Sequence, residues 1–502
     1  MNNKFETFKE NIINWYPFFE NARILVIDNE SKEVLKRLNE FSNEVTSITA
    51  LELDKQEDAF DYILLFSDNT EIENVKKFLK EEGKILIITD NDFGITSFSN
   101  ASKEGKIKLE KAKKNINTVI EKLKENDFVY QNIYLCFPNK ENIELILNAK
   151  ENLNKEQIQN YTPQIPAENI KLFDEIAILK NMIKYNKKLF NQMSNSYLIE
   201  ASKKDNISDI SYVSFNNCRK EKYRLITKIT SNNVEKIPAN EIAKSHLEKM
   251  KENIEILNQE QIKLLDYVED NKIYSKFEKE AETLDNILAQ YYNDLDNVVE
   301  KLNDIKEILI NKSISYEKVN FDNARKIIKD MDEKERRKLH FLENAFWDMI
   351  PKNCFFKNNE YVFFDQEWRE KYLPVEFIIY RSVINSYELV KKIDVNELFN
   401  KLEIQEYINT FKLLDEEIRD EIIDNEIYEQ LYKNENKAID NLINDNSAYR
   451  DNDKKQTDYI KQLEDDNKKK QEYIEILEKQ NKEKQKVIDE LSKKKKNYFH
   501  FN

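Results

Sequence analysis

Acidic and amide side chains stand at positions that suit metal and phosphoryl chemistry near the end of the globular part of this sequence. Asp348 and Asn353 share one turn-like segment, and Asp365 and Glu367 follow an aromatic, β-prone run of hairpin length. Oxygen ligands suit Mg²⁺, and a neighbouring aspartate can orient an attacking hydroxyl. This spacing indicates a site of the phosphotransferase type.

The same residues also have a purely structural interpretation. Aspartate and asparagine are common in turns, so Asp348, Asn353 and Asp365 could be turn residues of a hairpin whose aromatic side chains fill a core. Trp347 and Trp368 flank the acidic cluster, and we expect both to anchor that core.

The composition excludes several classes of site. The chain has 502 residues, 40% of them hydrophobic, which is enough for two or three domains. Its net charge of −15 opposes non-specific binding of nucleic acid. Zinc sites and disulfide frameworks are not expected, because the few cysteines and histidines are scattered: Cys136, Cys218, Cys354, His246, His340 and His500. We expect His246 and His340 at surface or capping positions, and Cys354 as a buried thiol.

The elements that must position these side chains follow from hydrophobic periodicity. Residues 22–100 alternate short apolar runs with amphipathic segments, which predicts a parallel sheet covered by helices. The later segments are expected as a helix at 106–126, a strand at 128–137, a polar and mostly helical connector to about 194, an antiparallel meander at 195–230, a helix near 239–260, a strand at 272–277, and helices to about 345 and again over 376–445.

The segment 449–491 has the heptad pattern of a coiled coil. With Ile460 at position a, apolar heptads alternate with Asn/Lys heptads along the seam Ile460, Leu463, Asn467, Lys470, Ile474, Leu477, Asn481, Lys484, Ile488 and Leu491. Asparagine at position a sacrifices stability and fixes register and parallel pairing. We therefore expect a parallel homo-oligomer, a dimer or a trimer, with a solvated single helix as the alternative.

The first hundred residues resemble class I S-adenosylmethionine (SAM)-dependent methyltransferases, of the type found in bacterial cell-surface polysaccharide loci. The resemblance covers about residues 12–100 and is most specific in GKILIITDNDFG. It implies a Rossmann-like α/β fold. The family's three cofactor-binding glycines fall on Asp28, Glu30 and Lys32, and its ribose-binding acidic residue falls on Thr49.

These departures remove the cofactor cradle, because side chains stand where only glycine leaves room. Glu52 could replace the ribose ligand if the second strand slips in register. We expect a degenerate domain that does not bind SAM productively.

Residues 195–384 resemble the superfamily of protein kinases and aminoglycoside phosphotransferases. The nearest resemblance is to the kinase-like region that follows the methyltransferase domain in bifunctional polysaccharide kinase–methyltransferases, where a coiled coil comes last. On this resemblance Asp348 is the catalytic aspartate, and Asn353 and Asp365 are the Mg²⁺ ligands. ATP would contact Lys236, with Glu241 as its helix partner, and a hinge near Phe277 and Glu278.

Two departures leave the activity open. The catalytic-loop histidine position is Phe346, and no glycine is present after Gly105 to form a phosphate-covering loop, for which the polar segment 202–209 is the candidate. The module could be an active Mg·ATP-dependent kinase that phosphorylates a glycan hydroxyl, or a pseudokinase.

Together these patterns predict an α/β Rossmann-like methyltransferase-type domain, an α+β kinase-like domain and a C-terminal parallel coiled coil. The expected boundaries are 1–138, a connector 139–194, 195–445, 446–496 and a tail 497–502. The resemblance implies a non-catalytic scaffold or regulator of O-antigen- or capsule-type polysaccharide assembly, with glycosyltransferases or other glycan-assembly enzymes as partners. Active SAM-dependent methylation is the third alternative.

The expected location is the cytoplasm, at the inner face of the plasma membrane if the tail binds lipid. The first ten residues carry acids and no apolar core, so we expect no secretory signal, and no apolar run is long enough for a transmembrane segment. The basic, aromatic tail KKKKNYFHFN could touch an anionic membrane surface.

Overall fold

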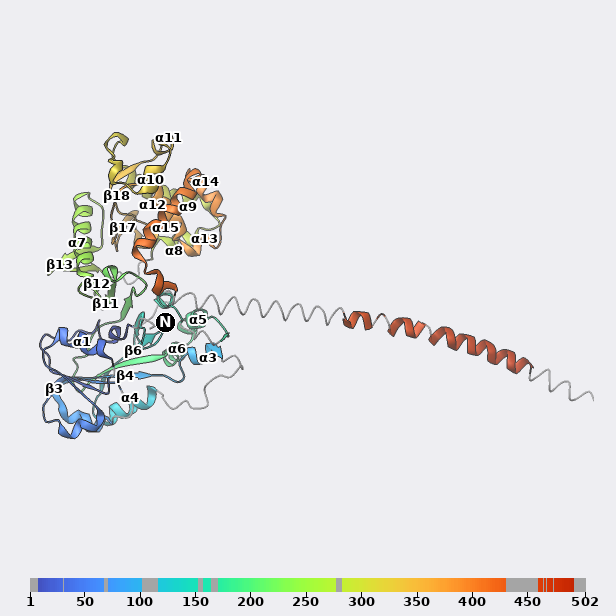
Figure 1. The fold of residues 1–502 in the computed structure, drawn as a ribbon, viewed down its shortest axis with the longest axis horizontal. Helices are drawn as coiled ribbons and strands as arrows, with labels where there is room; N and C mark the ends of the chain where they lie inside the picture. The colour runs from blue at the N-terminus through green and yellow to red at the C-terminus, as the bar shows by residue number, and fades with distance from the viewer. Residues whose placement is uncertain are drawn as a thin grey trace, which may run out of the picture. The chain divides into compact units, whose positions relative to one another are not determined.

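The computed structural model describes residues 8–29, 31–66, 71–101, 116–151, 157–163, 170–276, 282–429, 459–463, 465, 467–472 and 474–491. The chain forms two compact units, Met1–Glu435 and Asn436–Asn502. Figure 1 shows the elements of the first unit and the helix of the second.

A single twelve-stranded sheet runs through the first unit in the order β13-β14-β12-β11-β10-β7-β6-β9-β4-β3-β1-β2. Its strands are β1 Ile24–Ile27, β2 Val45–Ile48, β3 Phe60–Leu65, β4 Leu79–Asp90, β6 Tyr130–Phe137, β7 Leu145–Asn148, β9 Ser196–Ser202, β10 Tyr212–Phe215, β11 Leu225–Ile229, β12 Asn233–Pro238, β13 Asp266–Glu269 and β14 Lys272–Lys276.

The parallel sheet expected over residues 22–100 is confirmed. Strand β1 pairs in parallel with β2 and β3, and β3 pairs in parallel with β4. Side chains of these strands alternate between two apolar layers, with Leu25 and Ile27 in one and Ile24 and Val26 in the other. Burial on both faces explains the nearly continuous apolar runs.

Helices cover both faces of this part of the sheet. Helix α1 and the turn η1 Lys9–Ile12 pack on one layer, and α4, α5 and α6 pack on the other. The α-helices between residues 32 and 259 are α1 Lys32–Phe41, α2 Ile72–Val75, α3 Thr96–Ser99, α4 Ile116–Glu125, α5 Glu175–Tyr185, α6 Lys187–Gln192 and α7 Lys244–Gln259.

Strand β9 lies elsewhere than the sequence suggested. It was expected to open a meander over residues 195–230, but it pairs antiparallel with β4 on one side and β6 on the other. All seven of its residues are buried, and such a strand needs neighbours on both edges and layers on both faces. The antiparallel meander is instead β10–β11–β12, continued by β14 and β13.

The range 139–194, expected as a helical connector, contains helices α5 and α6 and also strand β7. This strand pairs with β6 and with β10. Through β7 the parallel part of the sheet is continuous with the antiparallel part. A small additional ladder joins β5 Asn100–Ala101 to β8 Ile170–Lys171.

A mostly helical region with its own apolar core follows β14. In Figure 1 its helices α8, α9, α12 and α15 lie close together. The helices are α8 Leu284–Gln290, α9 Leu295–Ile310, α10 Lys326–Asp330, α11 Glu333–Arg336, α12 Val375–Ile384, α13 Tyr387–Val390, α14 Val395–Lys401 and α15 Ile408–Ile422. Two short ladders lie among them, β15 Phe341–Ala345 with β18 Glu370–Pro374 and β16 Cys354–Lys357 with β17 Glu360–Phe363.

The second unit is helical at 459–463, 467–472 and 474–491. Its apolar seam residues are exposed in the single chain, including Ile460, Leu463, Ile474 and Leu477. In the described part of the chain, no helix combines the length and apolar character that crossing a bilayer demands.

Candidate functional site

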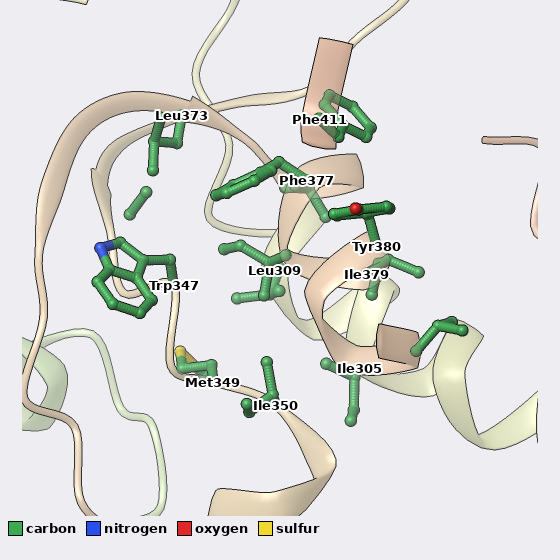
Figure 2. Close-up of a cluster of buried hydrophobic side chains, with 14 of the residues drawn as sticks. Ile305, Leu309, Trp347, Met349, Ile350, Leu373, Phe377, Ile379, Tyr380 and Phe411 are labelled. Carbon is green, nitrogen blue, oxygen red and sulfur yellow. The ribbon is translucent and has the colours of Figure 1, made fainter. Parts of the chain in front are cut away.

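The loop that carries Asp348 is anchored by the apolar residues around it. Trp347, Met349 and Ile350 are buried and lie in one cluster with Leu309 of α9 and Phe377 of α12 (Figure 2). Because its neighbours are fixed in this core, the backbone at Asp348 is held in one position. The expectation that Trp347 is a core anchor is confirmed.

The carbonyl oxygen of Asp348 organises the turn. It accepts hydrogen bonds from the backbone N–H of Ile350 at 2.8 Å, from Asn353 Nδ2 at 3.2 Å and from Gln366 Nε2 at 3.2 Å. The amide nitrogen of Asn353 therefore holds the loop. Its carboxamide oxygen is the atom that a metal ion would require.

The hairpin expected between Asn353 and Asp365 is present as β16 and β17. Asn358 and Asn359 form its turn with φ of 54° and 61°, the left-handed conformation that asparagine tolerates and that two-residue hairpins require. Cys354 is buried, as expected. Asp365 follows the hairpin directly, also with a positive φ, of 58°.

Lys236 and Asp365 are brought together. Lys236 lies on β12, and its Nζ is 2.9 Å from Asp365 Oδ1. Burial lowers the pKa of Lys236, but Asp365 and Glu367 outweigh it, and the pKa is raised. The expected partner Glu241 is wrong, because Glu241 pairs with Lys244 at 2.7 Å on the exposed first turn before α7. Only five positions after Lys236, beyond the end of the strand, Glu241 is directed to solvent.

Helix α7 reaches the site through other residues, His246 and Asn253. These two are seven positions apart and therefore lie on one face of the helix. His246 Nε2 is 2.8 Å from Glu367 Oε1, and Asn253 Nδ2 donates to the carbonyls of Gln366 and Glu367 at 3.2 and 3.1 Å. The expectation that His246 is a surface residue is wrong, since it is buried. His340 is half-exposed and pairs with Glu376 at 2.7 Å.

Glu367 is the most tightly held carboxylate of the site. Its side chain is 3% exposed, and Arg219, from the loop between β10 and β11, forms an ion pair with it. Burial raises the pKa of Glu367, but Arg219, the hydrogen bond from His246 and the charge of Lys236 prevail and lower it to about 2. Glu367 is therefore ionised at any physiological pH.

Two tryptophans separate the two arginines of the site. Trp347 and Trp368 are stacked at 5.6 Å with an interplanar angle of 11°. The guanidinium of Arg219 lies 5.3 Å from the centre of the Trp368 ring, and that of Arg381 lies 4.3 Å from the centre of Trp347. Such cation–π contacts hold each arginine beside the carboxylate that it neutralises.

Arg381 of α12 is the cation nearest to Asp348. One of its nitrogens lies 3.7 Å from Asp348 Oδ1, and the guanidinium also pairs with Asp415 of α15. Burial raises the pKa of Asp348 to about 7, because the effect of Arg381 is smaller and the nearby charges of Glu367 and Asp365 also raise it. A carboxyl group with this pKa can take or give a proton near neutral pH.

Asp266 on β13 completes the acidic group. Its carboxylate accepts from Ser275, and more weakly, at 3.4 Å, from the N–H of Gln366. Burial raises the pKa of Asp266 to about 6. In the part of the chain that the structure describes, no group of three or more His, Cys, Asp or Glu side chains is arranged to hold a metal ion.

The remaining expected contacts of the nucleotide, Phe277 and Glu278, lie outside the described residues. The loop between β10 and β11, which supplies Arg219, also differs from the expected phosphate-covering loop. Residues 202–209 connect β9 and β10, which are not neighbours in the sheet, whereas residues 216–224 connect the adjacent strands β10 and β11. The sequence signal for Arg219 was weak, as one basic residue in a polar turn.

At the end of β1, the turn expected to have lost its SAM-binding glycines is filled by internal hydrogen bonds. Asp28 has a φ of 57°, the conformation in which glycine is favoured, and its Oδ1 accepts from the N–H of Ala50 at 2.8 Å. Glu52 accepts from the N–H and the hydroxyl of Thr49 at 3.0 Å each. Glu30 lies outside the described residues, and Lys32 begins α1.

No protein-family model matches this chain, and no curated protein matches it either.

Proposed function

We propose that this protein is a non-catalytic scaffold or regulator of the assembly of bacterial cell-surface polysaccharides of the O-antigen or capsule type. It combines a methyltransferase-like module without its cofactor site and a kinase-like module whose acidic site is neutralised from within. Glycosyltransferases or other glycan-assembly enzymes are the proposed partners. The pathway rests on the resemblance of the sequence and on the order of its modules.

The arrangement of β10, β11, β12 and α7 supports the kinase-like assignment. Lys236 lies on the third strand of an antiparallel set and a helix follows that strand, as in protein kinases, where a lysine of the third strand contacts the phosphates. Asp348, Asn353 and Asp365 then come together around the hairpin.

The observation that carries the non-catalytic proposal is the pairing of charges inside the site. Arg219 neutralises Glu367, and Lys236 neutralises Asp365. A metal–nucleotide complex would have to break these pairs, and an uncompensated buried charge is costly. The protein cations therefore take the place that a metal ion would need.

The methyltransferase-like module is proposed to be structural on similar grounds. Asp28 and Glu52 use their carboxylates to satisfy backbone N–H groups of residues 49 and 50. Titration of the full chain with SAM should show no saturable heat at micromolar concentrations. Micromolar affinity would contradict this part of the proposal.

The second candidate function is a working Mg·ATP-dependent kinase that acts on a glycan hydroxyl. It is favoured by the pKa of Asp348 near 7, which suits a general base, and by the position of Lys236 on β12, the third strand of the antiparallel set. Lys236 would hold phosphate oxygens, and Asn353 and Asp365 would supply oxygen ligands to Mg²⁺. Active methylation remains the least favoured alternative.

Thermal unfolding with 5 mM Mg·ATP separates the first two candidates. A ligand that binds only the folded state stabilises it, by about 2.7 kcal/mol at a concentration of 100 Kd. The scaffold proposal expects no change in the wild-type melting temperature. An upward shift of several degrees that disappears in Asp365→Ala would establish the kinase-like ligand site and refute the proposal.

The coiled coil is proposed to join copies of the chain in parallel, as a dimer or a trimer. The exposed apolar seam of the second unit requires a partner helix, and a second copy has the matching seam. A peripheral contact of the basic, aromatic residues 493–502 with an anionic membrane at the cytoplasmic face belongs to the same proposal, although these residues lie outside the described part of the chain.

A further inference from the structure

The loop between β10 and β11 is held along its backbone by the last residue of α15 and the two residues that follow it. The N–H of Lys220 donates to the carbonyl of Ile422 at 2.8 Å, and the N–H of Asp424 donates to the carbonyl of Cys218 at 2.9 Å. Arg219 and Ile423 form an antiparallel bridge between these two bonds. Residues 218–224, here called the strap, are thus joined to residues 422–424, here called the latch, by one antiparallel bridge and the two backbone hydrogen bonds that flank it.

Whereas the backbone of the strap contacts the latch, its side chains contact the acidic site, which is the group of Asp266, Asp348, Asp365 and Glu367. Arg219 pairs with Glu367, and the ring of Tyr223 packs edge-on against Trp368 at 5.0 Å and against His246 at 5.1 Å. Arg219 therefore connects the latch to the acidic site, because its backbone is bridged to the latch and its guanidinium pairs with Glu367. Lys220, the next residue of the strap, extends its side chain to the carbonyl of Asp420 at 2.8 Å.

Further contacts fix the strap at its end. Arg224 Nε donates to the carbonyl of Arg219 at 2.8 Å, and its guanidinium lies 4.0 Å from the carboxylate of Asp424. The latch leads from α15, which belongs to the helical core, into the residues that connect to the C-terminal unit. A displacement of this segment would remove the backbone support that holds Arg219 on Glu367.

We propose that the latch is an autoinhibitory contact: residues 422–424 hold the strap closed over the acidic site, and their release opens the site to a metal–nucleotide ligand. The inference rests on the kinase-like site of the proposed function and adds its regulation. It also gives the C-terminal segment a route to the site, since the strap can open only when the latch moves.

Substitution of Lys220 by proline tests the latch with a matched control. Lys220 has φ −55° and ψ 144°, which proline adopts without strain, and the preceding Arg219 is in a bridge and so has the extended backbone that a following proline requires. Lys220→Pro removes the N–H that bonds Ile422, together with the side-chain bond to Asp420. Lys220→Ala removes the side-chain bond alone.

Hydrogen–deuterium exchange of the full chain measures whether the strap opens. We expect exchange of residues 218–224 and of Asp424 to be about fivefold faster in Lys220→Pro than in Lys220→Ala, because one backbone hydrogen bond contributes roughly 1 kcal/mol. Exchange within α9 and α12 should be equal in the two variants, which also verifies folding. Equal exchange of the strap in both variants would overturn the latch.

Thermal unfolding with 5 mM Mg·ATP measures whether an open strap exposes the site. We expect a stabilisation in Lys220→Pro that is absent in Lys220→Ala and is lost when Asp365→Ala is added. A second variant, Arg219→Gln, opens the site from the other side and should gain the same stabilisation. An open strap without this gain in either variant would refute autoinhibition and leave the scaffold proposal intact, whereas binding by the wild type would refute the scaffold proposal separately.

Discussion

Glu367 is the residue on which the charge balance of the site depends. It is buried, it is held by Arg219 and His246, and its pKa is lowered to about 2. Because this pKa lies below the ordinary value of 4.5, the stabilisation is complete above about pH 4.5 and is lost as the pH falls toward 2.

Removal of the partner of Glu367 should therefore be costly. We expect Arg219→Ala to lower the free energy of unfolding by about 3 kcal/mol, since it leaves a buried carboxylate with fewer cations. Added to Glu367→Gln, it should cost at least about 1 kcal/mol less than it does alone. Urea unfolding of the wild type, both single variants and the double variant measures this coupling, and strict additivity would show that the pair contributes nothing.

Asp348 has the opposite pH dependence. Its pKa of about 7 in the folded chain is above the ordinary value of 3.8, so between about pH 4 and 7 the folded chain retains a proton that the unfolded chain has lost. The free energy of unfolding should fall as the pH rises through this window. We expect Asp348→Asn to make this decline shallower in unfolding curves taken from pH 4 to 8. An unchanged slope would place the pKa of Asp348 near its ordinary value.

Among the elements, the turn after β1 shows how a backbone shape can persist with different side chains. Asp28 adopts a positive φ of 57° and uses its carboxylate to satisfy the N–H of Ala50. Aspartate is one of the few residues other than glycine that visit this region. The turn therefore keeps a glycine-like backbone while its side chain spans the space between β1 and β2.

Variants of Asp28 separate the backbone effect from the hydrogen bond. We expect Asp28→Ala to destabilise by about 2 kcal/mol, because it combines left-handed strain with a lost hydrogen bond. Asp28→Gly should cost about half as much, since glycine carries no strain there. Asp28→Asn keeps an acceptor and tolerates the conformation, so its melting temperature should stay close to that of the wild type. Equal losses for alanine and asparagine would contradict this account.

Helix α7 was located by its periodicity, but its role was decided by packing. Its inward face carries His246 and Asn253 among apolar residues, and both bind the segment 366–367. The only signal in the sequence was a pair of polar residues, His246 and Asn253, seven positions apart in a predicted helix. The acidic candidate Glu241 stood outside the helix and off this face.

At the scale of the whole molecule, one sheet joins the two parts of the first unit. The β7–β10 pair connects the N-terminal strands to the antiparallel meander, so backbone hydrogen bonds relate the two regions. The described residues of the second unit are helical, and their apolar seam side chains are exposed in the single chain.

Assembly through this seam is directly testable. We expect the full chain to have two or three times the 60.3 kDa mass of one chain by light scattering. Ile474→Lys combined with Leu477→Lys places charges at positions a and d and should give a single-chain mass, because apolar contacts at these positions hold the helices together. Ile476→Lys, an equally exposed residue outside the seam, is the control and should leave the mass unchanged. A wild type with the mass of one chain would refute the oligomer.

The local structure of this protein could be predicted from its sequence. The apolar runs of β1, β3 and β4, the hairpin around Asn358 and Asn359, and the helical repeat of residues 459–491 are all patterns of neighbouring residues. Such patterns report backbone preference and the periodicity of burial. Asp348, Asn353 and Asp365 could be named as candidates for the same reason, since a short segment holds all three.

Tertiary structure alone decided which elements and charges became partners. Arg219 and Glu367 are separated by 148 positions, and nothing in the spacing of either indicates the other. The place of β9 between β4 and β6, the pairing of Lys236 with Asp365 and the burial of His246 arise in the same way. Long-range partners are selected by the fit of whole layers and by the cost of leaving a buried charge unpaired, and both depend on the complete fold.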